Sequence, residues 1–246
     1  MQIKTFFKKI HTFVLDALFP ACCLGCKKEG AWICEVCFSR IKFNTQQVCP
    51  VCEKRNTPDG RICFECMNKK PLDGLLNVSS YQDKLLHKAV HHYKYRFIHD
   101  LHVPLGNLLL KAFENSELPL PEIIIPVPLH ARRLRWRGFN QATLLAKELG
   151  NKLTPNFAIP VLENVLIRQK YTAPQMKIKH HAERQANLAN AFAIENPQAI
   201  KNKRILLVDD IATTGSTIFE CAKVLKQNGA RSVFAIVLAR QSSSNS

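Results

Sequence analysis

The distribution of cysteine constrains this chain most strongly. Nine of its ten cysteines lie between Cys22 and Cys66, and eight of these nine form four C-x-x-C pairs. The pairs are Cys23 with Cys26, Cys34 with Cys37, Cys49 with Cys52, and Cys63 with Cys66. A C-x-x-C turn presents two thiolates to one metal ion, and two such turns complete the four-sulfur tetrahedron that zinc prefers in closed structural sites. The pattern therefore predicts structural rather than catalytic zinc, one ion or two.

The spacing of the pairs leaves the ligand sets open. A sequential pairing would place the first two pairs in one site and the last two in the other, and a cross-braced pairing is equally allowed. Cys22 could replace Cys23 as a ligand. The segment has too few core residues to fold without metal, so we expect metal binding and folding to be coupled. A redox-active dithiol and disulfides are the alternative interpretations.

The amino-terminal residues, 1–19, predict an amphipathic helix, because apolar residues recur at three- and four-residue steps before Pro20. We expect this helix to pack against the rest of the chain, with binding to a membrane surface as the alternative. Charged residues interrupt it, so it does not resemble a secretory signal. Nothing in the sequence approaches the roughly 18 apolar residues of a spanning helix. We therefore expect a cytoplasmic protein, in which thiols stay reduced.

A second informative pattern lies near the carboxyl end of the chain. Four apolar residues, Ile205–Val208, predict a buried parallel strand, and 217–228 predicts a helix. Between them lie Asp209, Asp210 and a turn rich in threonine, serine and glycine. Backbone N–H groups at a helix N-terminus hold phosphate in this context. The two carboxylates would repel a phosphate, so they suit neighbouring hydroxyl groups such as a ribose diol.

Residues 205–217 resemble the phosphoribosyl pyrophosphate (PRPP) loop of the type I phosphoribosyltransferases: four hydrophobic residues, two acids, and a threonine- and glycine-rich turn. Over nearly its whole length the chain resembles the ComF family, with its leading helix, cysteine pairs and phosphoribosyltransferase-like domain. The segment 137–141 and the stretch 168–192 also match that family. The resemblance implies an α/β fold: a parallel sheet of the type I phosphoribosyltransferase fold with a small N-terminal Cys-rich zinc-ribbon domain.

The resemblance also implies a site for PRPP and Mg²⁺. Asp209 and Asp210 would be the catalytic residues and would bind the ribose hydroxyls. The residues that it assigns to PRPP are Val208, Ala212, Thr213, Thr214, Gly215, Ser216, Thr217, Val127, Arg132, Arg133 and Arg137. A flexible loop carrying Arg168, Gln175 and Arg184 would close over the substrate. Neither the residues nor the resemblance identifies the acceptor nucleophile.

The sequence predicts four parts, and strands alternate with helices in the third. The parts are a helix over 1–19, a zinc-ribbon domain over 20–70, a phosphoribosyltransferase-like domain over 71–240 and a frayed tail over 241–246. Candidate strands are 74–80, 122–127, 161–167, 204–208 and 232–239, and candidate helices are 83–95, 101–114, 138–150, 181–190 and 217–228. Such alternation favours a parallel sheet. His87 and His91 are four residues apart without an evident third ligand, so we expect them to be packed or solvated.

The charge balance bears on function. Lysine and arginine number 35 against 19 acids, a formal net charge of +16, which fits a polyanionic substrate or nucleic acid. The leading hypothesis is a PRPP-binding transferase that, as the resemblance implies, acts in natural transformation with single-stranded DNA and other competence proteins as partners. One alternative is a nucleic-acid- or protein-binding adaptor with PRPP as a regulatory ligand. Another is a nucleobase-salvage phosphoribosyltransferase.

Overall fold

The computed structural model describes residues 20–67, 71–170 and 190–241. The chain divides into two compact units, Met1–Ile41 and Lys42–Ser246. The first unit contains the short helix α2 (Glu35–Phe38), which begins after Cys34 and includes Cys37 of the second C-x-x-C turn, and the second unit contains the other cysteine pairs and the sheet. The helix expected over 1–19 lies outside the described residues. Within the described ranges, no helix is both long and apolar enough to cross a membrane.

The core of the second unit is a parallel sheet, as predicted, and it has four strands. The strands are β1 (Gly74–Ser80), β2 (Ile123–Pro126), β5 (Arg204–Ala212) and β6 (Ser232–Arg240), in the spatial order β1-β6-β5-β2. Their centres are runs of Ile, Leu and Val that are buried on both faces, which is the pattern expected of a parallel sheet covered by helices. Ile123 pairs with Ile205 and Val208 with Ile236, so β5 lies in the middle with a neighbour on each side.

The expectation of a fifth strand over 161–167 is wrong in its partner and its bounds. Only Leu166–Arg168 forms a strand, β3, and it pairs antiparallel with β4 (Phe192–Ile194) in a separate two-stranded sheet. Val161 makes only an isolated bridge to Ile124. Antiparallel pairing needs only that the chain turn back from β3 to β4. A parallel strand in the main sheet would need a longer crossover connection.

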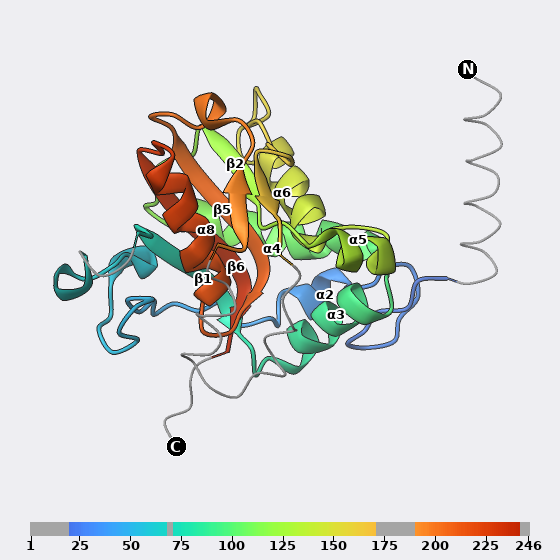
Figure 1. The fold of residues 1–246 in the computed structure, drawn as a ribbon. Coiled ribbons are helices and arrows are strands. Elements are labelled where there is room, and N and C mark those ends of the chain that lie inside the picture. Colours follow the sequence, from blue (N-terminus) through green and yellow to red (C-terminus); the bar gives the residue numbers. More distant parts are fainter. Residues whose placement is uncertain (1–19, 68–70, 171–189, 242–246) are drawn as a thin grey trace. The chain divides into compact units, whose positions relative to one another are not determined.

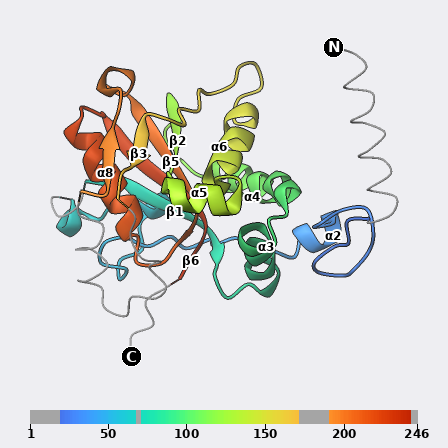
Figure 2. The same ribbon diagram turned by 45° about the vertical axis from the view of Figure 1, so that its right-hand side comes forward.

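Helices cover both faces of the sheet. The covering helices are α4 (His102–Glu114), α6 (Gln141–Lys152) and α8 (Ser216–Gln227), whereas α3 (Lys84–Tyr95) follows the end of β1. Figure 1 and Figure 2 show α8 on one face and α4 with α6 on the other. Alternate strand residues such as Ile205 and Leu207 join Cys221 and Leu225 of α8 in one apolar cluster. The predicted helix over 181–190 lies outside the described residues.

One further helix, α5 (Ala131–Arg137), was not predicted, because it buries none of its residues and is rich in arginine. The side chain of His130 caps its N-terminus and Gly138, with φ of 77°, ends it. The next helix therefore begins at Gln141 instead of at 138, capped by Asn140. Short 3₁₀ turns complete the unit at Pro58–Gly60, Phe64–Cys66, His99–Leu101 and Pro197–Ala199.

Candidate functional site

A cavity of about 720 Å³ opens at the carboxyl ends of β2 and β5, where parallel α/β sheets place their ligands. Its walls come from the end of β1, α3, the segment after β2, α5, the start of α6, β3, the end of β5 and the start of α8. Of the residues predicted for the site, it gathers Val127, Arg132, Arg133, Arg137, Arg168, Asp209, Asp210, Thr213 and Thr217. Segments far apart in the sequence thus meet in one hollow.

The two acids lie within β5 itself, because the strand continues to Ala212 instead of ending at Val208 as predicted. The carboxylate of Asp210 forms an ion pair of 2.8 Å with Lys94 on α3. Their side chains are only 8% and 19% exposed. The backbone N–H of Asp210 donates to Oδ1 of Asp209 at 2.8 Å, which holds the neighbouring carboxylate beside it.

The proton affinity of Asp209 is raised. Burial, first, and then the negative charge of Asp210 raise the pKa of Asp209 to about 8, although Lys94 opposes the shift. Nearby, Tyr93 is buried and its hydroxyl donates to the backbone carbonyl of Gln141 at 3.0 Å. Burial and the charge of Asp210 raise the pKa of Tyr93. Around neutral pH, Asp209 can therefore hold a proton while Lys94 balances the carboxylate of Asp210.

The turn after β5 has the form of an anion site. Gly215 has φ of 74°, a left-handed conformation, and α8 begins directly after it at Ser216. The hydroxyls of Thr214 and Ser216 lie 2.7 Å apart and bond each other, so they hold the turn closed. Thr213 and Thr217 line the cavity instead. The cavity therefore meets the helix N-terminus, where the backbone N–H groups and the helix dipole favour negative charge.

The remaining predicted residues of this segment do not line the cavity. Val208 and Ala212 are buried in the strand, and Thr214, Gly215 and Ser216 shape the turn. Val208 accepts the backbone N–H of Val127 at 2.9 Å and so fixes the start of the segment after β2. These residues support the site geometry instead of facing into the hollow.

Arginines from two elements form one wall of the cavity. Arg132, Arg133 and Arg137 come from α5, and Arg168 comes from β3. Burial and the charge of Arg133 lower the pKa of Arg168, whereas Asp209 and Cys221 oppose the shift. Guanidinium groups this close to one another favour an anion between them, and their paired N–H groups suit phosphate oxygens. Gln175 and Arg184, predicted for the flexible loop, lie outside the described residues.

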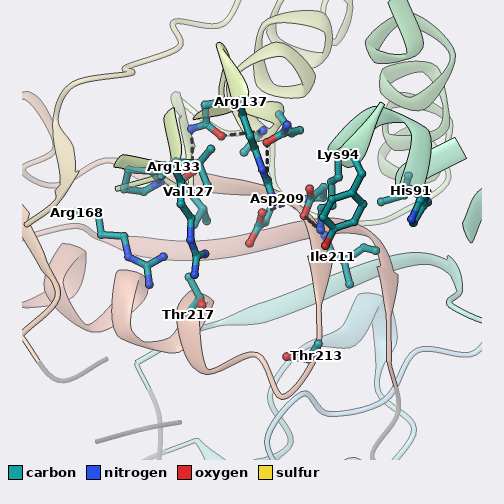
Figure 3. A pocket seen from close by; sticks show the side chains of 18 of the residues that line it. His91, Lys94, Val127, Arg133, Arg137, Arg168, Asp209, Ile211, Thr213 and Thr217 are labelled. Carbon is teal, nitrogen blue, oxygen red and sulfur yellow. Dashed lines mark hydrogen bonds and ion pairs between the residues drawn. The ribbon is translucent and has the colours of Figure 1, made fainter. Parts of the chain in front are cut away.

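The opposite wall was missed by sequence reasoning. It comes from α3, which contributes His87, His91, Lys94 and Tyr95. Figure 3 shows Arg133 and Arg168 on one side of Asp209, and Lys94 and His91 on the other. His87 and His91 are exposed, as a solvated role predicts, but they face this cavity. The helical spacing of His87, His91 and Lys94 indicates that they share one face of a helix, but it does not indicate that this face lines a cavity.

The cysteines form two clusters with the sequential pairing. In each cluster, all four sulfur atoms lie within 4.8 Å of one another. The first cluster consists of Cys23, Cys26, Cys34 and Cys37, and the second consists of Cys49, Cys52, Cys63 and Cys66. Cys22 is in neither cluster, and its thiol points to the carbonyl of Pro20 at 3.5 Å. The structure therefore favours Cys23 over Cys22 and excludes the cross-braced arrangement.

The chemistry of both clusters fits zinc. A tetrahedron with Zn–S bonds of about 2.3 Å separates its sulfurs by about 3.8 Å, and the Cys26–Cys34 and Cys52–Cys63 sulfurs lie 3.6 and 3.9 Å apart. Backbone N–H groups of Lys54 and Arg55 lower the pKa of Cys52 to about 6, whereas burial raises the pKa of Cys63 and of Cys66 in the same cluster. The two clusters are thus consistent with two structural zinc ions.

Two known domain families match separate parts of the chain. The phosphoribosyl transferase domain family matches residues 137–246, and the double zinc ribbon domain family matches residues 14–67. Among solved structures, the allosteric regulatory enzyme of purine biosynthesis is 18% identical, with 56% of this chain and 26% of that chain covered and a TM-score of 0.38.

Curated relatives extend over nearly the whole chain. The DNA utilization protein YhgH of Salmonella typhi is 34% identical over 90% of this chain and 97% of its own length. Competence protein F of Haemophilus influenzae is 31% identical over 89% of this chain and 90% of its own length. Competence protein ComFC of Bacillus subtilis is 28% identical over 87% of this chain and 86% of its own length. With its double zinc ribbon and its phosphoribosyltransferase domain, the chain belongs to the family of ComF and YhgH proteins.

Proposed function

We propose that the cavity binds PRPP together with Mg²⁺ and that the chain transfers the phosphoribosyl group to an acceptor. One observation carries this proposal. The Asp209–Asp210 pair, with Lys94 against it, lies in the same hollow as a helix N-terminus on one side and an arginine wall on another. A sugar that carries a phosphate at one end and a pyrophosphate at the other has groups that match these three features in the same order.

The charges of the site suggest how PRPP would lie. The 5-phosphate would bind Thr213, Thr217 and the N-terminal N–H groups of α8. The ribose hydroxyls would bond to the two aspartates, as the sequence predicts. The pyrophosphate, with Mg²⁺ as part of the substrate, would face the arginines of α5 and Arg168.

This orientation accounts for the chemistry. The bond between the anomeric carbon and the pyrophosphate oxygen would break while the acceptor's lone pair forms the new bond. Positive charge would develop on the ribose beside the carboxylate of Asp210, and negative charge on the leaving pyrophosphate beside the arginines. Lys94 neutralises one of the two carboxylates, so that the acids do not repel the phosphates of the substrate. Positioning and charge stabilisation would supply most of the rate.

The wall formed by α3 is the side left for the acceptor. The rings of His91 and Tyr95 contact each other there at a tilt of 44°, with centroids 4.9 Å apart, and His87 contributes a second imidazole. An imidazole can accept the proton that an attacking nitrogen or hydroxyl releases. The relatives named for competence and DNA utilization suggest that this transfer serves natural transformation.

A specific observation favours a second candidate, binding of single-stranded nucleic acid. Three exposed aromatic residues, Tyr95, Phe97 and Trp136, gather near the cavity with Arg137. The guanidinium carbon of Arg137 lies 5.8 Å from the centroid of Tyr95 and 5.9 Å from that of Trp136. Exposed aromatic faces interleaved with arginine are typical of surfaces that stack bases.

Calorimetric titration with Mg-PRPP tests the first proposal. We expect Asp209→Asn combined with Asp210→Asn to weaken binding by about 100-fold, because one hydrogen bond to the charged carboxylate of Asp210 and one to the protonated carboxyl of Asp209 are lost, together about 3 kcal/mol. Glu163→Gln is the matched control, since that carboxylate also pairs with a lysine but is not among the residues lining the cavity. Unchanged affinity in the double variant would refute the site. Pyrophosphate release with candidate bases would then identify the acceptor.

A further inference from the structure

The second cysteine cluster is built into the sheet. The segment that carries it, residues 42–67, runs along β1, which is an edge strand. Two isolated antiparallel bridges join the segment to that strand, Phe43 with Ser79 and Arg61 with Gly74. The amide of Gln47 donates to the carbonyl of Asn77 at 2.8 Å and accepts its N–H at 3.0 Å. The segment thus covers the free edge of the sheet, which would otherwise offer unpaired backbone groups.

The contact between segment and strand is tight. A Cβ at Gly60, which has φ of +69°, would lie 2.1 Å from the carbonyl oxygen of Leu75. Ile62 packs both against the apolar cluster of the sheet and against the cluster formed by Cys49, Cys63 and Cys66. The second cysteine cluster therefore shares its packing with the sheet.

The link from this cluster toward the cavity is Arg240. Its side chain is only 8% exposed, and its guanidinium donates to the carbonyl of Pro50 at 2.9 Å and to the carboxylate of Glu53 at 2.5 Å. Pro50 lies inside the Cys49–Cys52 turn, and the N–H of Glu53 donates to Cys49 at 2.9 Å in closing that turn. Both partners of Arg240 are thus positioned by the turn that a metal ion would hold.

The other end of the link reaches the phosphate-binding turn. Arg240 is the last residue of β6 and pairs in register with Ala212, the last residue of β5. The next N–H, that of Gln241, donates to the carbonyl of Ala212 at 2.9 Å. Gln241 and Thr213, the residues after these two strand ends, both line the cavity. A continuous set of contacts therefore runs from the second cysteine cluster to the wall of the site.

We propose that the second cysteine cluster, with zinc bound, positions the phosphate-binding turn, 213–217, and that Arg240 is the positioning residue that connects the two. The effect on PRPP rests on the function proposed above, whereas the effect on the turn does not. Coupling of this kind is reciprocal, so a ligand in the cavity must stabilise zinc in this cluster as much as zinc stabilises the ligand. Arg240 does not bind the ligand itself, because its guanidinium is buried against Glu53.

Hydrogen exchange on the full zinc-loaded chain tests the proposal. In Arg240→Met we expect amides of 209–217 and of 241 to exchange about tenfold faster, while those of 123–125 stay unchanged and two zinc ions remain bound. Arg240→Lys should restore part of the protection, because it keeps the charge beside Glu53. Arg231→Met is the matched control, since Arg231 is an exposed arginine directly before the same strand.

The ligand readouts separate this proposal from the proposed function. In the native chain, saturating Mg-PRPP should slow zinc release to a chelating dye from one of the two clusters, and Arg240→Met should remove that effect while raising the Kd about tenfold. Failure of the native chain to bind Mg-PRPP would reject the proposed function and leave the exchange result to decide. Exchange in 209–217 that equals the native rate, or that rises equally throughout the sheet, would overturn the positioning role. If Arg240→Met does not fold, Glu53→Gln is expected to give the same local pattern in smaller measure.

Discussion

The ion pair between Lys94 and Asp210 offers the sharpest test of the site's electrostatics. The two groups are 2.8 Å apart and 19% and 8% exposed. With an effective dielectric constant of about 20, Coulomb's law gives about 6 kcal/mol of attraction at this distance. Desolvation of the two charges offsets much of that attraction. We therefore expect a net coupling free energy of about 2–3 kcal/mol.

A double-mutant cycle measures this coupling. The variants are Lys94→Met, Asp210→Asn and their combination, and the measurement is the free energy of unfolding in urea by far-UV circular dichroism. Lys94→Met alone should destabilise the chain most, because it leaves the Asp210 carboxylate buried without its cation. The double variant should recover much of that loss, since the remaining amide carries no charge.

The surface supplies a control pair of the same chemistry. Lys147 and Glu163 are 2.7 Å apart, but their side chains are 50% and 39% exposed. A solvent-exposed pair of this kind contributes about 0.2–1 kcal/mol. Equal coupling in the two cycles, or less than about 0.5 kcal/mol for the cavity pair, would refute the argument that burial makes the Lys94–Asp210 pair strong.

Two further predictions concern the same cavity. The pKa of Asp209 is about 8 when folded, against an ordinary value of 3.8, so the folded chain holds an extra proton between these values and its stability declines as pH rises through that window. The free energy of unfolding of Asp209→Asn, measured in urea, should therefore rise relative to that of the native chain from about pH 5 to pH 9. A difference between the two free energies that does not change with pH would contradict this. Trp136→Ala should weaken binding of an oligothymidine by about 1–3 kcal/mol of stacking, measured by fluorescence anisotropy, and affinity should fall steeply with salt. Equal affinity for native chain and variant would argue against the aromatic surface.

Features that depend only on neighbouring residues in the chain could be predicted from the sequence. The spacing of the C-x-x-C pairs indicated four-cysteine sites, which the two sulfur clusters bear out. The run from Ile205 to Thr217 indicated a buried strand, an acidic pair and a helix N-terminus, because each depends on local geometry and on the burial of a few adjacent side chains. The end of the strand differs from the prediction, since pairing with β6 extends it through both acids, and the helix lies one residue earlier, at Ser216–Gln227.

Features that depend on contacts between distant segments were decided by the tertiary structure. Lys94 meets Asp210, and Arg240 meets the second cysteine turn, only because parallel strands bring their carboxyl ends together and the segment 42–67 covers β1. The choice of sequential pairing is of the same kind, since spacing alone satisfies both arrangements. Local pattern determines which groups a chain possesses, whereas the packing of the whole sheet determines which of them share one partly buried cavity. Interactions between charges are stronger there than in water because the effective dielectric constant is lower.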